Sequence, residues 1–374
     1  MEEIINLIVW AAIIQGFFLG IIFIASRKHH SFANQLLGFF LFAFVFVALT
    51  DLLPFNKIGN YFISGYFTLP EVKLLFPVLF LHFVLEKVGR STRYRSFLKV
   101  HYFLSFAIIS LTLINLMLFM VFSNSLLDLF GWQILEHFYM GQQYYAFILT
   151  VCAFIIAIKE TLSYRNLVRN EFSDIALLNI KWLWQFIFII APIILFWGAE
   201  LIRIAFGGRG NSELTIIVYI FIAVFNYFVS FKAFTHQTLF DGSMDKIRAL
   251  EDKALISDKS NTQFDAEICN EIKNEMEIKK HYLNQNLTIH DFSKKITITS
   301  RTISTCINQS MGLNFNEWVN NYRVENALKM IQSDSKNVLS IEGIGLDSGF
   351  KSRSAMYAAF KKKTGHSPGH FRNV

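Results

Sequence analysis

The stretch that decides the fold lies near the C-terminal end, where residues 287–312 read LTIHDFSKKITITSRTISTCINQSMG. An apolar-periodic helix is predicted to begin there with Thr288 as its N-cap, and to end in a turn at 296–298. Thr299 is a good N-cap for a second helix, because a threonine side chain accepts a hydrogen bond from a free amide of the first turn. Gly312 stands where glycine commonly ends a helix. The stretch is therefore predicted to be a helix-turn-helix motif.

A second motif of the same kind is predicted further along the chain. A helix at 315–331, roughly 25 Å long at ~1.5 Å per residue, connects the two. Ser340 caps the next short helix, and the last helix runs over 352–364 until Gly365 and Pro368 end it. A single helix-turn-helix also occurs in ordinary protein cores. Two in series favour DNA binding, since a helix of this size fits the major groove.

The charge of this region supports the same interpretation. Residues 281–374 hold twelve basic and six acidic side chains, a net charge of +6 on a small domain. Such an excess is the electrostatic footprint of a protein that binds a polyanion. The alternative is a basic face that is simply solvated.

The N-terminal part of the chain has the composition of a membrane protein. A membrane-spanning helix needs about 20 mostly apolar residues. Seven segments approach this length, which a soluble all-α core would not hold in series with short polar joints. They are 4–25, 35–54, 68–86, 100–122, 142–158, 182–204 and 214–233.

Lysine and arginine are distributed unevenly among the loops that connect these segments. The loops after the first, third and fifth segments hold eleven, and the alternate loops hold two. Basic residues mark the cytoplasmic side of a membrane protein. The N-terminus is therefore predicted to lie outside and the C-terminus in the cytoplasm, as an odd number of spans requires. The predicted location is the cytoplasmic (inner) membrane.

Together these patterns predict an all-α fold in three parts. A seven-helix transmembrane bundle occupies 1–235, a charged linker with an amphipathic helix occupies 236–280, and a soluble tandem helix-turn-helix domain occupies 281–374. The apolar stripe of the linker either packs on the adjacent domain or forms a dimer seam, although it is too short for a self-sufficient coiled coil. The stripe consists of Phe264, Ile268, Ile272 and Met276.

Polar residues inside the predicted spans are candidates for a signal site, because ionisable groups are costly in lipid. Glu200 and Arg203 stand three apart on one helix and can pair, and His82 lies in the third segment. The alternative for each is an interfacial ion pair or a structural hydrogen bond.

Motifs for catalysis, metal binding and disulfide formation are not recognisable. The chain has no nucleophile–base set, no phosphate-binding loop and no H-E-x-x-H pattern, so neither an enzyme nor a bound cofactor or metal is expected. The three cysteines have no C-x-x-C partner or nearby histidine cluster, and no disulfide is expected. They are Cys152, Cys269 and Cys306.

The C-terminal residues resemble a known family. The stretch from about 287 to 372, under a quarter of the chain, resembles the DNA-binding domain of AraC/XylS-type transcription regulators. With its multi-span N-terminal region, the chain is similar to the membrane-bound AraC-type regulators of Bacteroidetes-like bacteria. The matching residues are Arg323, Ala327, Ile344, Gly349, Phe350, Ser352, Ser354, Phe360, Lys361, the run TGHSP at 364–368, Phe371 and Arg372.

The resemblance implies roles for the exposed residues of the second helix of each motif. The base-reading candidates are Arg301, Ser304 and Thr305 in the first motif and Arg353, Ser354 and Ala358 in the second. Ala358 is shorter than the side chain common at its position, and Gly345 stands where alanine is usual. The second motif is therefore expected to hold phosphate mainly through Lys361, Lys362 and Lys363, which positions a protein without specifying sequence.

The sequence thus predicts a membrane-tethered, sequence-specific DNA-binding transcription regulator that couples a signal at or in the membrane to promoter activity. Its expected partners are the major groove of promoter DNA, the lipid bilayer, a second copy of the chain, and an unidentified small-molecule or envelope signal. The alternative is a seven-span receptor or transporter-like protein whose helix-turn-helix tail is a protein-interaction adaptor. Specific DNA binding by the tail would separate the two.

Overall fold

The computed structural model describes residues 2–25, 31–52, 57–58, 61–62, 71–122, 130–173, 180–207, 212–235, 266–333 and 338–372. Within them the chain forms 13 α-helices, three short 3-10 helices and one antiparallel hairpin of two-residue strands, β1 (Lys57–Ile58) and β2 (Tyr61–Phe62). The predicted all-α class is therefore confirmed apart from this hairpin. Contacts divide the chain into an N-terminal unit, Met1–Thr161 with Lys181–Lys253, and a C-terminal unit, Leu162–Ile180 with Ala254–Val374.

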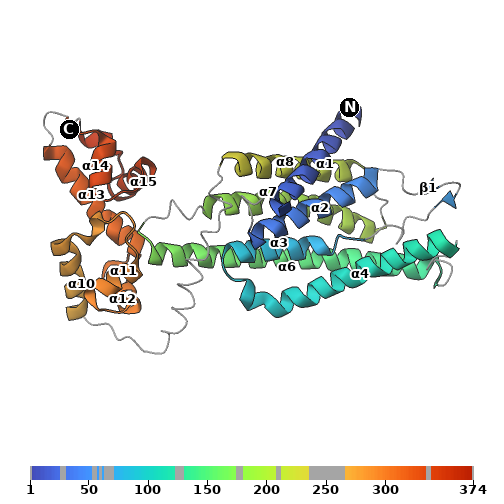
Figure 1. Ribbon diagram of the computed structural model, residues 1–374, viewed down its shortest axis with the longest axis horizontal. Helices are drawn as coiled ribbons and strands as arrows, with labels where there is room; N and C mark the ends of the chain where they lie inside the picture. Colours follow the sequence, from blue (N-terminus) through green and yellow to red (C-terminus); the bar gives the residue numbers. More distant parts are fainter. Residues whose placement is uncertain are drawn as a thin grey trace. The chain divides into compact units, whose positions relative to one another are not determined.

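Long apolar helices make up the N-terminal unit, and each predicted apolar segment overlaps one of them (Figure 1). They are α1 (Glu2–Ala25), α2 (Phe32–Leu52), α3 (Leu75–Lys87), α4 (Arg95–Phe122), α6 (Trp132–Glu171), α7 (Ile180–Ala205) and α8 (Ser212–Thr235).

Four of these helices are long and apolar enough to cross a membrane, over Phe32–Leu49, Ser91–Leu118, Gln133–Asn170 and Trp182–Ala205. Two more contain shorter apolar stretches, Val9–Ala25 and Ile217–Lys232. Helix α3 has 13 residues and is therefore only about 20 Å long, shorter than the predicted third span. The count of seven spans stays a prediction.

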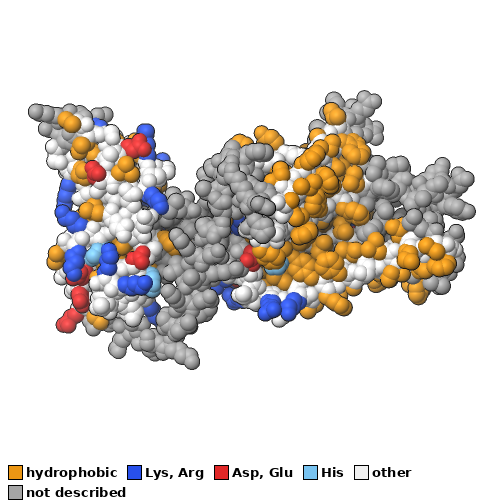
Figure 2. Space-filling model, viewed as in Figure 1, with side chains coloured by type: hydrophobic (Ala, Val, Ile, Leu, Met, Phe, Trp, Pro, Cys, Tyr) orange, Lys and Arg blue, Asp and Glu red, His pale blue; other side chains and the backbone are white. Residues whose placement is uncertain are grey.

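Large apolar side chains point outward from these helices as well as inward. Phe103 on α4, Leu195 on α7 and Phe206 after α7 are 73%, 71% and 88% exposed, and Figure 2 shows hydrophobic atoms spread over this unit. The interior holds packed aromatic rings such as Phe40, Phe44 and Phe225. Exposure of this kind in water would be a liability, whereas in lipid it is favourable.

Helix α6 is longer than any membrane span requires. Its 40 residues extend over about 60 Å at ~1.5 Å per residue, roughly twice the hydrocarbon thickness of a bilayer. The predicted span at 142–158 is only its middle. Residues of α6 up to Thr161 belong to the N-terminal unit and those from Leu162 onward to the C-terminal unit. One continuous helix is therefore shared by the two units.

The C-terminal unit is a small helical domain built on the long helix α13 (Phe315–Ser333). One core packs the first part of α13 with the preceding elements, and a second core packs the rest of α13 with the following ones. The preceding elements are α10 (Ala266–Lys279), η5 (His281–Leu283), α11 (Ile289–Ile296) and α12 (Ser300–Met311); the following ones are α14 (Ile341–Asp347), α15 (Arg353–Thr364) and η6 (Pro368–Arg372).

The amphipathic stripe of the predicted linker is part of this domain. Ile272 and Met276 of α10 are fully buried in the first core, and Ile268 packs against it. Phe264 lies outside the described residues. Of the two alternatives, packing on the adjacent domain is the one that the structure supports, so the buried side chains of this stripe do not offer a dimer seam.

The expectation of no disulfide is wrong for this structure. Cys269 on α10 and Cys306 on α12 form a disulfide bond, with Cα atoms 5.3 Å apart. Both side chains belong to the first core. Sequence spacing could not show the pairing, because the two cysteines stand 37 residues apart and meet only when α10 folds against α12.

Candidate nucleic-acid interface and candidate signal pocket

Both helix-turn-helix motifs form where the sequence predicted them. Thr288, Thr299, Ser340 and Ser352 cap their helices, each side chain accepting a hydrogen bond from a backbone amide of the first turn. The second helices, α12 and α15, end at Gly312 and Gly365, which have positive φ values of 67° and 81°. Glycine adopts this conformation without steric cost. Local sequence signals therefore determine the limits of both helices.

Helix α12 of the first motif has a buried face and an outer face. Ile303 and Ile307 are fully buried, whereas Arg301 is exposed and Ser304 and Thr305 are half-buried. Asn308 donates a hydrogen bond to the Ser304 hydroxyl at 3.3 Å. The three base-reading candidates of this motif therefore share the outer side of a helix that is fixed from within.

Helix α15 of the second motif has the same organisation. Met356 and Phe360 are buried in the second core, and the base-reading candidates Arg353, Ser354 and Ala358 are exposed. The Arg353 guanidinium lies over the ring of Tyr357 at 5.1 Å and donates to its hydroxyl at 3.3 Å. Arg353 is thus held along the helix and does not extend freely from it.

The three phosphate candidates on α15 do not behave alike. Lys362 forms an ion pair with Glu317 of α13. Lys363 pairs with Glu325 at 2.5 Å and donates to the Asn321 carbonyl at 2.9 Å. Lys361 follows Ser354 and Ala358 at helical spacing and therefore shares their outer face. Among the described residues, an ion pair is formed by Lys362 and by Lys363 but not by Lys361, which leaves Lys361 as the phosphate candidate on the outer face.

Two glycines explain how the second motif packs. A Cβ at Gly345 would lie 2.7 Å from the Met356 sulfur, so glycine at this position leaves room for that methionine. A Cβ at Gly349, where φ is +87°, would lie 2.4 Å from the carbonyl oxygen of Tyr282. The turn of the second motif thus touches the backbone just before the first motif, which only glycine permits.

A buried arginine joins the two motifs. Arg323 of α13 is 1% exposed; its Nε donates to the Tyr282 carbonyl and its Nη2 to the Asn284 carbonyl, both at 2.8 Å. Its guanidinium lies 6.0 Å from the ring of Phe350 in the turn of the second motif. Arg323, one of the residues that carry the family resemblance, therefore connects the backbone before the first motif to the turn of the second.

Ser173, two residues after the end of α6, also contacts Arg323, which the sequence analysis did not anticipate. Arg323 also donates to the Ser173 hydroxyl at 3.1 Å and to its carbonyl at 3.3 Å. Asn316 donates to the same carbonyl at 2.7 Å, and the Ser173 amide donates to the Leu287 carbonyl at 3.1 Å. Residues that sequence analysis assigned to a cytoplasmic loop thus contribute to the helix-turn-helix domain.

An ion-pair network lies beside these hydrogen bonds. Arg169 of α6 pairs with Glu317 at 3.3 Å, and Glu317 also pairs with Lys362 of α15. Burial alone would raise the pKa of Glu317, but its hydrogen bonds with Lys362 and Asn314 and the charges of Lys362 and Arg169 hold the pKa below its ordinary value. Glu317 is therefore a carboxylate that connects α6 to the second helix of the second motif.

A helical stripe could have indicated that α6 continues past its last apolar turn. Thr161, Tyr164 and Val168 recur at spacings of three and four, and all three are buried. The charges of this region obscured the stripe, because they were read only as loop charges that define orientation. Arg169 and Ser173 carried no separate sequence signal.

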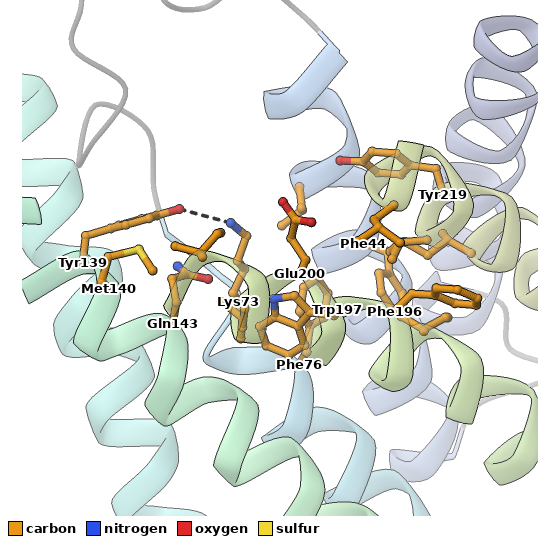
Figure 3. Close-up of a pocket in the computed structure, with 17 residues that line it drawn as sticks. Phe44, Lys73, Phe76, Tyr139, Met140, Gln143, Phe196, Trp197, Glu200 and Tyr219 are labelled. Atoms are coloured by element: carbon orange, nitrogen blue, oxygen red, sulfur yellow. Dashed lines mark hydrogen bonds between the residues drawn. The ribbon is translucent and has the colours of Figure 1, made fainter. Parts of the chain in front are cut away.

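A cavity of about 260 Å³ lies within the N-terminal unit. It is larger than the ~30 Å³ of a water molecule and slightly smaller than most small-molecule sites. In Figure 3, Lys73, Tyr139 and Gln143 lie on one side, Phe44, Phe196 and Tyr219 lie on the other, and the Glu200 carboxylate lies between them. Lys73 donates to the Tyr139 hydroxyl at 3.2 Å. The cavity thus combines an aromatic wall with a charged, hydrogen-bonding end.

The structure separates the three signal candidates that the sequence proposed. Glu200 lines the cavity, and Arg203 lies one turn further along α7 and is not among the lining residues. His82 is also outside the lining, with its Nδ1 3.0 Å from the Tyr102 hydroxyl. The sequence analysis noted Lys73 as polar without selecting it. Its position opposite an aromatic wall depends on how α3, α6, α7 and α8 pack.

Comparison with known proteins agrees with this geometry. Residues 292–373 match a family described as a helix-turn-helix domain. Over 117 residues, 31% of this chain, the sequence is 25% identical to the uncharacterized HTH-type transcriptional regulator YtdP of Bacillus subtilis (strain 168). The aligned part covers 15% of that relative's length. No solved structure matches the chain significantly. The C-terminal part of the chain therefore contains a helix-turn-helix domain, and it follows an N-terminal part with several long apolar helices.

Proposed function

We propose that this chain is a membrane-anchored transcription regulator that binds promoter DNA in a sequence-specific way and responds to a signal in the membrane. The observation that carries the proposal is the pair of capped helices α12 and α15, which are fixed from within and exposed on their outer faces. The family match and the relative described as a transcriptional regulator support the same function.

Base reading and phosphate binding are assigned to different residues. Arg301 is exposed near the N-terminal end of α12, where a recognition helix contacts base edges, and Lys361 is exposed near the end of α15. Arg301→Ala should lower discrimination between specific and unrelated sites by about 1–3 kcal/mol. Lys361→Ala should weaken binding to all sequences and reduce the salt dependence by roughly one charge. Binding titrations with the purified full-length chain at several salt concentrations measure both effects.

Lys362→Ala serves as the matched control for Lys361→Ala, because Lys362 is already paired with Glu317. Its effect on DNA affinity should be smaller. Equal, sequence-independent losses from Arg301→Ala and Lys361→Ala would make Arg301 a phosphate ligand only. No DNA binding by the wild-type chain would favour the alternative in which the tail is a protein-interaction adaptor.

Membrane anchoring is supported by the four long apolar helices and by their exposed apolar side chains. The proposed orientation has the N-terminus outside and the C-terminal domain in the cytoplasm, as the loop charges indicate. Reporter fusions or cysteine labelling at Ser125 and Ser163 should report outside and inside, respectively. The opposite pattern would place the helix-turn-helix domain away from DNA and overturn the function.

The proposed signal is a small amphipathic molecule bound in the cavity of the N-terminal unit. Its apolar body would pack on the aromatic wall of Phe44, Phe196 and Tyr219, and its polar head would accept a hydrogen bond from Lys73 and donate one to Glu200.

Because one motif pair reads a short site, two copies bound to adjacent sites would gain affinity through effective concentration. The homodimer is therefore part of the proposal.

A further inference from the structure

Helix α6 carries residues of both candidate sites. Tyr139, Met140 and Gln143 near its N-terminal end line the cavity. Arg169 near its C-terminal end contacts the helix-turn-helix domain. Arg169 stands 26 positions after Gln143, a distance of about 39 Å along the helix at ~1.5 Å per residue. The helix is continuous over this length.

The middle of α6 is held by a separate hydrogen bond and ion pair, both formed by Glu160. Glu160 is 1% exposed, accepts a hydrogen bond from the Tyr94 hydroxyl at 2.7 Å and pairs with Arg93 at 3.7 Å. Both partners belong to η2 (Ser91–Tyr94), the connection between α3 and α4. A buried charged group of this kind is costly to detach from its partners. The part of α6 between cavity and domain is therefore held in register with the N-terminal unit.

The two residues that follow α6 form several hydrogen bonds with the helix-turn-helix domain. Ser173 is 1% exposed and takes part in four hydrogen bonds, two from Arg323, one from Asn316 and one to Leu287. Phe172 forms an antiparallel β-bridge with Thr288, the N-cap of the first motif. This attachment reaches the first motif through backbone contacts.

The same end of α6 reaches the second motif by a different route. Arg169 and Lys362 share the Glu317 carboxylate, and Lys362 belongs to α15, the second helix of that motif. A shift of α6 would therefore act on both motifs at once, through hydrogen bonds to the first and through an ion-pair network to the second. Because the two second helices must occupy successive major-groove segments about 34 Å apart, a change in their relative placement changes the fit to DNA.

We infer that α6 transmits the signal from the cavity to the DNA-binding domain. Residues 139–143 of α6 contact the bound signal, and Glu160 holds the helix against the N-terminal unit. Arg169 and Ser173 pass the movement of the helix to the two motifs. This inference rests on the proposed function, since it assumes that the cavity receives the signal and that the domain binds DNA. It adds the route between the two sites.

Interrupting α6 between Glu160 and Arg169 tests the inference. Leu162 is exposed, and none of the contacts described above involves it. Leu162→Pro removes one helical hydrogen bond and kinks the helix there, and Leu162→Ala is the matched control. The cavity is altered with Glu200→Gln and, separately, Gln143→Leu. Promoter output in cells and DNA affinity of the full-length chain in detergent are measured for each combination.

The expected result is coupling that depends on an unbroken α6. Glu200→Gln or Gln143→Leu should change promoter output about fivefold or more in the wild-type and Leu162→Ala backgrounds, the lower end of usual allosteric factors. The same change in the Leu162→Pro background should leave output within about twofold. DNA affinity of the full-length chain should change in the same direction as promoter output in the wild-type and Leu162→Ala backgrounds, and should stay within about twofold of its starting value in the Leu162→Pro background. Arg169→Glu should uncouple partially, and Arg165→Glu, on an exposed position of the same helix, should not.

Two outcomes would overturn the inference. If the cavity variants shifted output equally with and without the proline, the signal would reach the domain by another route. If neither cavity variant shifted output in any background, the input would lie elsewhere. Both outcomes leave DNA binding by the full-length chain intact, so they are distinguishable from failure of the proposed function, in which that binding is absent.

Discussion

The two units of this chain use the same element, the α-helix, with opposite surfaces. On α4 of the N-terminal unit, large apolar side chains such as Phe103, Ile114 and Met117 are 73%, 54% and 63% exposed. Among the described residues of the C-terminal unit such side chains are fewer, Ile278 on α10 being one, and in Figure 2 charged and polar atoms cover much of the visible face of this unit. The first pattern suits helices whose outer surface meets lipid, and the second suits helices packed in water.

The interiors differ as well, because the C-terminal unit is organised around a charged side chain. Arg323 donates hydrogen bonds to three backbone carbonyls and two side-chain oxygens. Many of the hydrophobic contacts around it come from the two cores on either side. The hydrogen bonds of Arg323 therefore fix how the two small cores of this domain are placed relative to each other.

The largest expected effect therefore comes from removing that group. Arg323→Ala should lower the free energy of unfolding of the C-terminal unit by on the order of 3–5 kcal/mol, because several buried carbonyl groups lose their donors. Pulse proteolysis of the full-length chain in increasing urea measures this by following the C-terminal fragment. The control is Arg353→Ala on the exposed face, which should change stability by less than about 0.5 kcal/mol. Equal effects would mean that the buried network is not the organising feature.

A smaller effect is expected from placing the same new charge on each surface. Ile114→Arg on α4 should disfavour membrane insertion by about 2.5–3.5 kcal/mol if the position lies deep in lipid. Ile278→Arg on α10, where the wild-type side chain is 78% exposed, should be nearly neutral. The fraction of full-length chain that is monodisperse after extraction from membranes reports the difference. If both substitutions were tolerated, α4 would not face lipid, and the comparison between the two surfaces would fail.

The smallest expected effect concerns the thiols of the C-terminal unit. Cys269 and Cys306 form a disulfide in the structure, and in a chain-entropy model this bond would contribute about 4 kcal/mol when the chain is oxidised, for a loop of 37 residues. The cytoplasm keeps thiols reduced, so the proposed orientation predicts two free thiols and no effect of added reductant on stability. Alkylation in intact cells followed by mass measurement checks this. A disulfide found in cells would place the domain in an oxidising compartment and contradict the proposed topology.

Much of the C-terminal unit was predictable because its signals are local. The caps Thr288, Thr299 and Ser340 were each identified from the sequence, and each accepts the expected hydrogen bond. Ser352, predicted as the first residue of the last helix, is instead its N-cap. A cap depends on a few neighbouring residues, so its signal survives without knowledge of the rest of the chain. The same holds for the apolar segments of the N-terminal unit, where lipid requires long runs of one composition.

The sequence by itself thus determined where the helices of the two helix-turn-helix motifs begin and end, which parts of the chain are apolar, and which residues face outward on α12 and α15. Only the tertiary structure decided that α10 belongs to the domain core. It likewise decided that Lys362 forms an ion pair with Glu317 of α13, and that Glu200 and Lys73 line the same cavity. It also decided that Ser173 contacts Arg323, 150 residues away in sequence. Contacts over such separations leave no periodic pattern, because each depends on how whole helices pack and not on the residues beside it.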